Sequence, residues 1–324
     1  SADFTRSTVD ETYDFIESDL RQAIQSLPVK SDYAVGDLGR ATRGAAKALL
    51  ARVYLYQKRY DSASFFAEEV ILSQQYELES AFSDAFSLFG EFGLESVFEA
   101  GGIGNQGGIA AGNNEFTIAQ GVRGVPNRGI GTNRPSLDLI NSFEVGDPRM
   151  QATVIFVGET LDGIAIVGDS QTPDTTSTGQ PETYNQKIWI PGTTPFSNTG
   201  HNRRIIRYSE VLLIAAEAFN QEGNSQKALT YLNRVRERAR EGDPAILPDI
   251  TETNREALEA LILEERRHEL AMEGHRFWDV VRMGKAQEIF GPLGFQNGKH
   301  ELLPIPQSER DITNGLLNQN PNWN

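Results

Sequence analysis

The sequence predicts a mainly α-helical protein, in which tetratricopeptide-like helical hairpins carry a loop-rich insert with short β-strands. Three observations predict it. Apolar residues recur at helical spacing through 1–99 and 201–324, one helical hairpin occurs twice, and residues 100–200 are rich in glycine and asparagine. The 324 residues, 39% of them hydrophobic, can bury a large core without disulfides, and the chain has no cysteine.

The first helix is predicted directly after Thr8. Thr8 and Glu11 have the spacing of a capping box, and Pro28 marks the end of the helix. Between them runs one apolar stripe with members three or four residues apart: Val9, Tyr13, Ile16, Leu20, Ile24 and Leu27.

Two helical hairpins are predicted. In the first, a helix from Thr42 to about Gln57, rich in alanine, is followed by a helix from Tyr60 to about Ser73. In the second, helices over 203–221 and 225–240 flank a turn at Gly223 and Asn224. The connections are too short for anything but antiparallel neighbours.

The two hairpins align when the first is shifted by 165 residues, and the match has the small-aromatic-small spacing of a tetratricopeptide repeat. Chance similarity between any two amphipathic helix pairs is the alternative explanation. The matched pairs are Leu49 with Ile214, Ala51 with Ala216, Tyr54 with Phe219, Ala63 with Ala228, and Val70 with Val235.

Residues 100–200, called the insert from here on, cannot hold a long helix because glycine and asparagine interrupt every apolar run. Short strands are predicted at 153–157 and 164–167. Helices return at about 253–273 and 275–283 and are followed by an extended tail over 302–324. We therefore predict a single domain over 1–324, with helical regions at 1–99 and 201–324 on either side of the insert.

Charge and motif content exclude several functions. A net charge of −15 disfavours nucleic acid as a partner, because that interaction requires a basic surface. Glu264 and His268 are spaced to share a metal, but no second histidine joins them, so we expect a surface ion pair and no metal. Gly102, Gly104 and Gly107 match a dinucleotide fingerprint outside any βαβ unit, so no cofactor is expected.

Two charged residues occupy apolar positions of predicted helices. Glu210 and Arg267 each fall on a stripe of hydrophobic side chains, where an unpaired charge would be costly. We therefore predict that they belong to a buried ion-pair network joining the two C-terminal helical units. Trp278 is predicted to lie in the core, and Trp323 to pack the tail down.

The insert holds the candidate ligand-binding residues, because scaffolds of stacked helices commonly bind through inserted loops. Aromatic faces flanked by amides suit a sugar ring, which offers C–H groups to the ring and hydroxyls to the amides. The alternative is that Trp189 packs beneath the loops. The candidates are Trp189, Tyr184, Phe196 and Asn185, with Arg123, Asn127 and Arg128 from an earlier loop.

Five stretches, which follow one another along the chain in the same order as in the family, resemble the SusD/RagB family of Bacteroidetes outer-membrane lipoproteins. The most informative are Asn202-Arg-Arg-Ile-Ile-Arg-Tyr-Ser-Glu-Val-Leu-Leu213 and Glu264-Glu-Arg-Arg-His-Glu-Leu-Ala-Met-Glu-Gly-His-Arg-Phe-Trp-Asp279. The others are residues 43–54, residues 133–136 with 143–149, and residues 303–308 with 318–321.

The resemblance implies a tetratricopeptide-like fold and non-catalytic binding of glycans, or of peptides in some relatives. It further implies delivery to a SusC-like TonB-dependent transporter at the cell surface, and a lipid anchor in a segment preceding Ser1. Two alternatives stay open: a secreted glycan-degrading enzyme, although no carboxylate pair here forms a known catalytic motif, and an intracellular tetratricopeptide scaffold.

Overall fold

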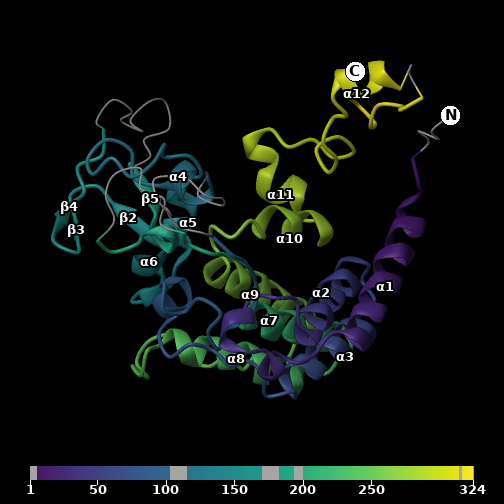
Figure 1. The fold of residues 1–324 in the computed structure, drawn as a ribbon, viewed down its shortest axis with the longest axis horizontal. Coiled ribbons are helices and arrows are strands. Elements are labelled where there is room, and N and C mark those ends of the chain that lie inside the picture. Colours follow the sequence, from purple (N-terminus) through teal and green to yellow (C-terminus); the bar gives the residue numbers. More distant parts are fainter. Residues whose placement is uncertain (1–5, 103–114, 170–181, 193–199, 314–315, 324) are drawn as a thin grey trace. The chain divides into compact units, whose positions relative to one another are not determined.

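Helices dominate the computed structural model of the chain, as the sequence predicts (Figure 1). The structure describes residues 6–102, 115–169, 182–192, 200–313 and 316–323. Two units divide the chain, a larger one of residues 20–273 and a smaller one of residues 1–19 and 274–324. In the described ranges, no helix combines the length and the apolar character needed to cross a membrane. The predicted single domain over 1–324 stays a prediction.

Helix α1 (Val9–Ser26) begins with the predicted capping box. The Thr8 amide donates to Glu11 Oε2 at 2.8 Å, and the Glu11 amide donates to Thr8 Oγ1 at 3.1 Å. No residue of this helix is fully buried. Leu20 and Ile24 pack against the main core, whereas Val9 is 70% exposed.

The first predicted hairpin is formed by α2 (Arg43–Tyr56) and α3 (Tyr60–Ile71). Thr42 caps α2, because its hydroxyl accepts a hydrogen bond from the Ala45 amide at 3.0 Å. Several alanines on α2 are buried, which allows the neighbouring helices to approach closely.

The second hairpin is formed by α7 (Tyr208–Gln221) and α8 (Ser225–Ala239). It packs on the first hairpin through α3 and α7, and α9 (Arg255–Glu269) packs against α7 (Figure 1). The prediction that the α7 helix begins at residue 203 is wrong, because Arg203–Arg207 form strand β6. This strand depends on a pairing partner about a hundred residues away.

The repeat alignment agrees with the burial pattern at four of its five pairs. Leu49 is 37% exposed although its equivalent Ile214 is fully buried. The members of the other four pairs are all buried in one hydrophobic core, so matching positions of the two hairpins have the same environment. These pairs are Ala51 with Ala216, Tyr54 with Phe219, Ala63 with Ala228, and Val70 with Val235.

The insert begins and ends in one small sheet. Strand β1 (Ser96–Ala100) pairs antiparallel with β6 (Arg203–Arg207), so the two ends of the insert lie side by side. Inside it, β2 (Val154–Phe156) pairs with β5 (Thr183–Asn185), and β3 (Thr160–Leu161) with β4 (Ile164–Ala165). These pairings overlap both predicted strand segments. Its short helices are α4 (Glu115–Gln120), α5 (Leu137–Ser142), α6 (Pro148–Thr153) and the 3-10 turn η4 (Gln186–Ile188).

The described part of the insert has its own small core and lies to one side of the helical hairpins in Figure 1, with β2 to β5 gathered beyond α6. Its core consists of Val122, Ile155, Ile166 and Tyr184. Further 3-10 turns of the larger unit are η1 (Lys30–Asp32), η2 (Val35–Asp37) and η3 (Phe82–Phe86).

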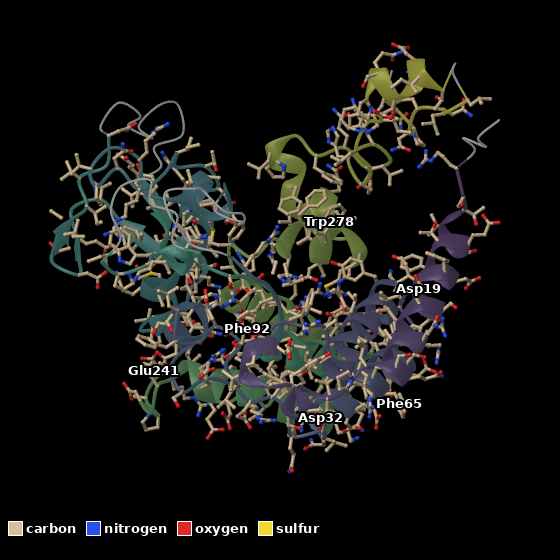
Figure 2. The ribbon with its side chains drawn as sticks, in the orientation of Figure 1. Asp19, Asp32, Phe65, Phe92, Glu241 and Trp278 are labelled. Carbon is tan, nitrogen blue, oxygen red and sulfur yellow. The ribbon has the colours of Figure 1, made fainter. Side chains whose placement is uncertain are left out.

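In the smaller unit, Phe277 and Phe295 pack around Val280 in a local apolar cluster. Trp278, labelled in Figure 2, is 46% exposed, so the prediction that it lies in the core is wrong. Trp323 packs the tail as predicted, because its Nε1–H donates to the carbonyls of Lys299 and Leu302. The helices of this unit are α10 (Arg276–Arg282), α11 (Ala286–Phe290) and α12 (Gln307–Ile312), with the 3-10 turn η5 (Gly291–Leu293).

Candidate functional site

A set of mostly buried charges, called the ion network here, fastens the insert to the helical hairpins. Arg149 on α6 and Lys187 on η4 belong to the insert, and their partners outside the insert lie on α9 and directly after it. The network consists of Arg149, Lys187, Arg207, Arg236 and Arg238 with Glu95, Glu144, Asp147, Glu265, Glu269 and Glu273.

Glu269 is the centre of this network. Its carboxylate accepts from Arg238 at 2.5 Å and from Arg207 at 3.0 Å, and it lies 3.3 Å from Arg149. Burial alone raises the pKa of this carboxyl group, but the three guanidinium groups together hold the pKa of Glu269 far below its ordinary range. Glu269 therefore stays charged although it is fully buried.

The ion network contains neither Glu210 nor Arg267, so the prediction that these two residues belong to a buried network joining the two C-terminal helical units is wrong. Glu210 is buried and is held by Arg52 on α2, which donates to its two carboxylate oxygens at 2.7 and 2.5 Å. Arg267 is paired with Asp138 and, at 3.4 Å, with Glu264. Helical periodicity identifies a buried charge, but it cannot choose among partners on distant elements.

Trp189 lies at the edge of the small core of the insert. Its Nε1–H donates to Asp162 Oδ2 at 2.6 Å, and the guanidinium carbon of Arg128 lies 3.8 Å from its ring centroid. Arg128 also donates to the Ile190 carbonyl at 2.9 Å, and burial lowers the pKa of its guanidinium. The structure thus brings two predicted site residues together as a stacked pair.

The other predicted site residues differ in how far they are buried. The Tyr184 ring is buried and its hydroxyl donates to Glu182, while Asn185 is buried and donates to Gln120 at 3.0 Å. Arg123 pairs with Asp169 at 2.6 Å. Asn127 is exposed. Phe196 lies outside the described residues.

A pocket opens where η4, the start of β6 and the end of α9 meet; we call it the Lys187 pocket. Lys187 donates to Glu273 at 2.8 Å and to the Glu269 carbonyl at 3.0 Å, and burial lowers its pKa to about 8. Burial also lowers the pKa of His201 to about 4, so its ring is uncharged at neutral pH. The lining comprises Phe86, Phe116, Asn185, Lys187, Ile188, His201, Asn202, Arg203, Arg204, Met272 and Glu273.

Of these residues, only Asn185 is among the ligand-binding residues predicted from the sequence. Arg203 was overlooked because residues 203–207 were assigned to a helix. As a strand, they alternate their side chains between two faces, and that alternation is the signal that could have singled out Arg203.

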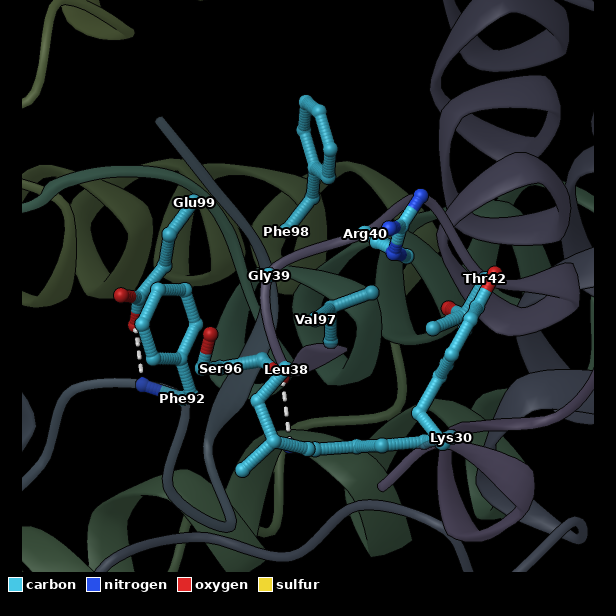
Figure 3. A pocket seen from close by; sticks show the side chains of 11 residues that line it. Lys30, Leu38, Gly39, Arg40, Thr42, Phe92, Ser96, Val97, Phe98 and Glu99 are labelled. Atoms are coloured by element: carbon cyan, nitrogen blue, oxygen red, sulfur yellow. Dashed lines mark hydrogen bonds between the residues drawn. The ribbon is translucent and has the colours of Figure 1, made fainter. Parts of the chain in front are cut away.

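A second pocket lies between Lys30 and β1 and is shown in Figure 3. Lys30 donates to the carbonyls of Gly93 and Ser96 at 2.5 and 2.9 Å, and the Phe92 amide donates to Glu99 at 3.2 Å. Burial lowers the pKa of Lys30 to about 8. Because these charged groups already have partners within the protein, we interpret this pocket as a structural feature of the fold and not as a ligand site.

Within the described ranges, no group of three or more histidine, aspartate or glutamate side chains is arranged to hold a metal. The predicted surface ion pair of Glu264 and His268 is wrong, because His268 is buried and stacks on Phe143 with ring centroids 4.9 Å apart. The glycine motif from Gly102 lies almost entirely outside the described residues.

Stacked helical hairpins interrupted by one irregular insert define the class of this molecule, a mainly helical, tetratricopeptide-like protein. The chain belongs to the SusD family, whose model matches residues 68–323. A second family model, described as starch-binding associating with outer membrane, matches residues 1–55.

Among curated proteins, "SusD-like protein P2" from Formosa agariphila is 41% identical over 127 residues, which cover 36% of this chain and 25% of that protein. A "SusD-like protein" from Bacteroides ovatus is 26% identical over 297 residues, covering 84% of this chain and 50% of that protein. The chain thus spans at most half the length of these curated relatives.

Among solved structures, a "Laminarin binding SusD-like protein" superposes with a TM-score of 0.79 at 30% identity and covers 98% of this chain and 70% of its own. "Surface glycan-binding protein A from Bacteroides thetaiotaomicron in complex with laminarihexaose" has a TM-score of 0.76 at 29% identity, covering 97% of this chain and 71% of its own.

Proposed function

We propose that this chain binds nutrient glycans without catalysis and delivers them to a SusC-like TonB-dependent transporter. It would act at the extracellular face of the outer membrane, in a protein held there by a lipid anchor. The observation that carries the proposal is the match, over 97% of this chain, to a glycan-binding protein whose structure was solved with laminarihexaose. The transporter and the anchor rest on the family resemblance.

We place ligand contact on the insert, at the stacked pair of Trp189 and Arg128. Asn127 and Arg123 would border it, and Phe196 completes the proposed set. Because one face of the Trp189 ring is covered by the guanidinium, a sugar would meet the edge of the stacked pair. The buried Tyr184 and Asn185 would act from beneath, by holding the loop backbone in place.

Isothermal titration of the protein with laminarihexaose, a broader panel of oligosaccharides and a set of peptides tests the function. We expect Trp189→Ala to weaken oligosaccharide binding roughly tenfold, because it removes a ring contact and releases Arg128. Trp278→Ala is the matched control, since this exposed tryptophan lies outside the insert, and we expect it to keep the wild-type affinity.

If none of the oligosaccharides binds, the proposed function is overturned. If only peptides bind, the ligand is a peptide and not a glycan. Wild-type affinity in Trp189→Ala would reject this site and leave glycan binding in place.

A further inference from the structure

We infer that the Lys187 pocket binds the carboxylate or sulfate group of an acidic sugar residue, and that Arg203 is the side chain that meets the anion. The inference rests on the proposed function, because it specifies the kind of glycan bound.

Arg203 is exposed, and its guanidinium carbon lies 4.8 Å from the ring centroid of Phe116. In the part of the chain that the structure describes, its guanidinium forms neither an ion pair nor a hydrogen bond, and only its backbone is paired, opposite Ala100 of β1. A guanidinium stacked on an aromatic ring is held in a fixed plane, and its N–H donors remain available at the mouth of the pocket.

The other charged groups of the pocket are already neutralised. Lys187 is paired with Glu273, and that carboxylate is shared with Arg207 at 2.8 Å. Arg204 donates to three backbone carbonyls and lies 3.4 Å from Glu99. The buried cations therefore have their counterions, and Arg203 is left with a charge that a ligand can satisfy.

The neutral polar groups of the pocket are also occupied. Asn185 donates to Gln120 and accepts from the Lys187 amide. Asn202 donates to Glu99 and accepts from the Gly102 amide. With these amides engaged, the pocket offers a neutral sugar little to bind, whereas a carboxylate or sulfate can take two parallel hydrogen bonds from Arg203.

The net charge of −15 does not prevent an anionic ligand from binding at this pocket. Exposed charges more than about 8 Å apart are largely screened at physiological salt, so the local field of Arg203 outweighs that of distant carboxylates. The overall negative charge disfavours anionic partners, but the local positive charge of Arg203 favours an anionic ligand at this pocket.

The test compares three probes of equal length by titration calorimetry: neutral laminarihexaose, a galacturonate hexamer that carries carboxylates, and a sulfated galactan hexasaccharide. Each is measured with the wild-type protein, Arg203→Ala, Arg203→Lys and the control Arg255→Ala. Arg255 is an exposed arginine at the first residue of α9, the end of that helix remote from the pocket, so its loss removes the same charge elsewhere.

We expect the wild type to bind one of the two acidic probes, with the affinity falling as salt rises, and which of the two it binds identifies the anion. Arg203→Ala should weaken that binding roughly tenfold to a hundredfold, Arg203→Lys should retain part of it, and Arg255→Ala should leave it unchanged.

Binding of laminarihexaose without binding of either acidic probe would overturn this inference and leave the proposed function standing. Acidic-probe affinity that is unchanged in Arg203→Ala would overturn it as well. Failure of all three probes and of the wider oligosaccharide panel would overturn the proposed function together with it.

Discussion

Replacing Glu269 with glutamine is expected to lower the free energy of unfolding at pH 7 by about 3–5 kcal/mol, the loss typical of a buried ion pair that loses one partner. Glutamine keeps the shape of the side chain but leaves Arg149, Arg207 and Arg238 with one fewer counterion in a buried environment. Urea unfolding followed by circular dichroism measures the loss.

The difference between wild type and Glu269→Gln should depend on pH. Because the folded-state pKa of Glu269 is depressed, its contribution is complete above the unfolded pKa of about 4.5 and is lost as the pH falls further. The two unfolding curves should therefore converge below that pH. Glu264→Gln, on the same helix with a 42% exposed side chain, is the control and should change stability by less than about 1 kcal/mol. Equal stability of Glu269→Gln and wild type at pH 7 would contradict the ion network.

Replacing Leu212 with alanine is expected to lower the free energy of unfolding by about 2–5 kcal/mol, because it leaves a cavity in a packed core. Leu212 is fully buried on α7, the helix that packs against α2, α3, α8 and α9. Thermal and urea unfolding both measure the effect.

Leu72→Ala provides the matched control, because Leu72 follows α3 and is 69% exposed. Its effect should stay within about 0.5 kcal/mol of zero, as is usual for surface substitutions. If the two variants lost equal stability, α7 would not be the centre of the helical core.

The helical hairpins could be predicted because their signals are local. The Thr8 and Thr42 caps, the buried alanines of α2 and the Gly223 turn depend on residues a few positions apart, and all occur where the sequence predicts them. The repeat alignment also located side chains such as Tyr54 and Phe219 in the shared core.

Features that depend on distant partners were missed or misassigned. Strand β6 forms only because β1 lies beside it, and the charge of Glu210 is compensated by Arg52 rather than by Arg267. The exposure of Trp278 likewise depends on which elements surround its helix. Helical periodicity in the sequence does not identify those elements.

Part of the candidate site followed from residue types. Trp189, predicted as an aromatic face among amides, and Arg128, predicted separately from an earlier loop, are in contact. Tyr184 lies in the small core of the insert instead, because β5 pairs with β2 and turns its ring inward. The Lys187 pocket is lined by five segments far apart in the sequence, so no local pattern could reveal it.

We propose that the helical hairpins form a frame and that the insert is the surface that holds the glycan. A crystal structure of the protein soaked with the tightest-binding hexasaccharide among laminarihexaose, the galacturonate hexamer and the sulfated galactan tests this claim most directly. We expect ordered sugar density against the insert, at Trp189 and Arg128 or at Arg203. Sugar bound only along α2, α3, α7 or α8, with the insert untouched, would contradict it.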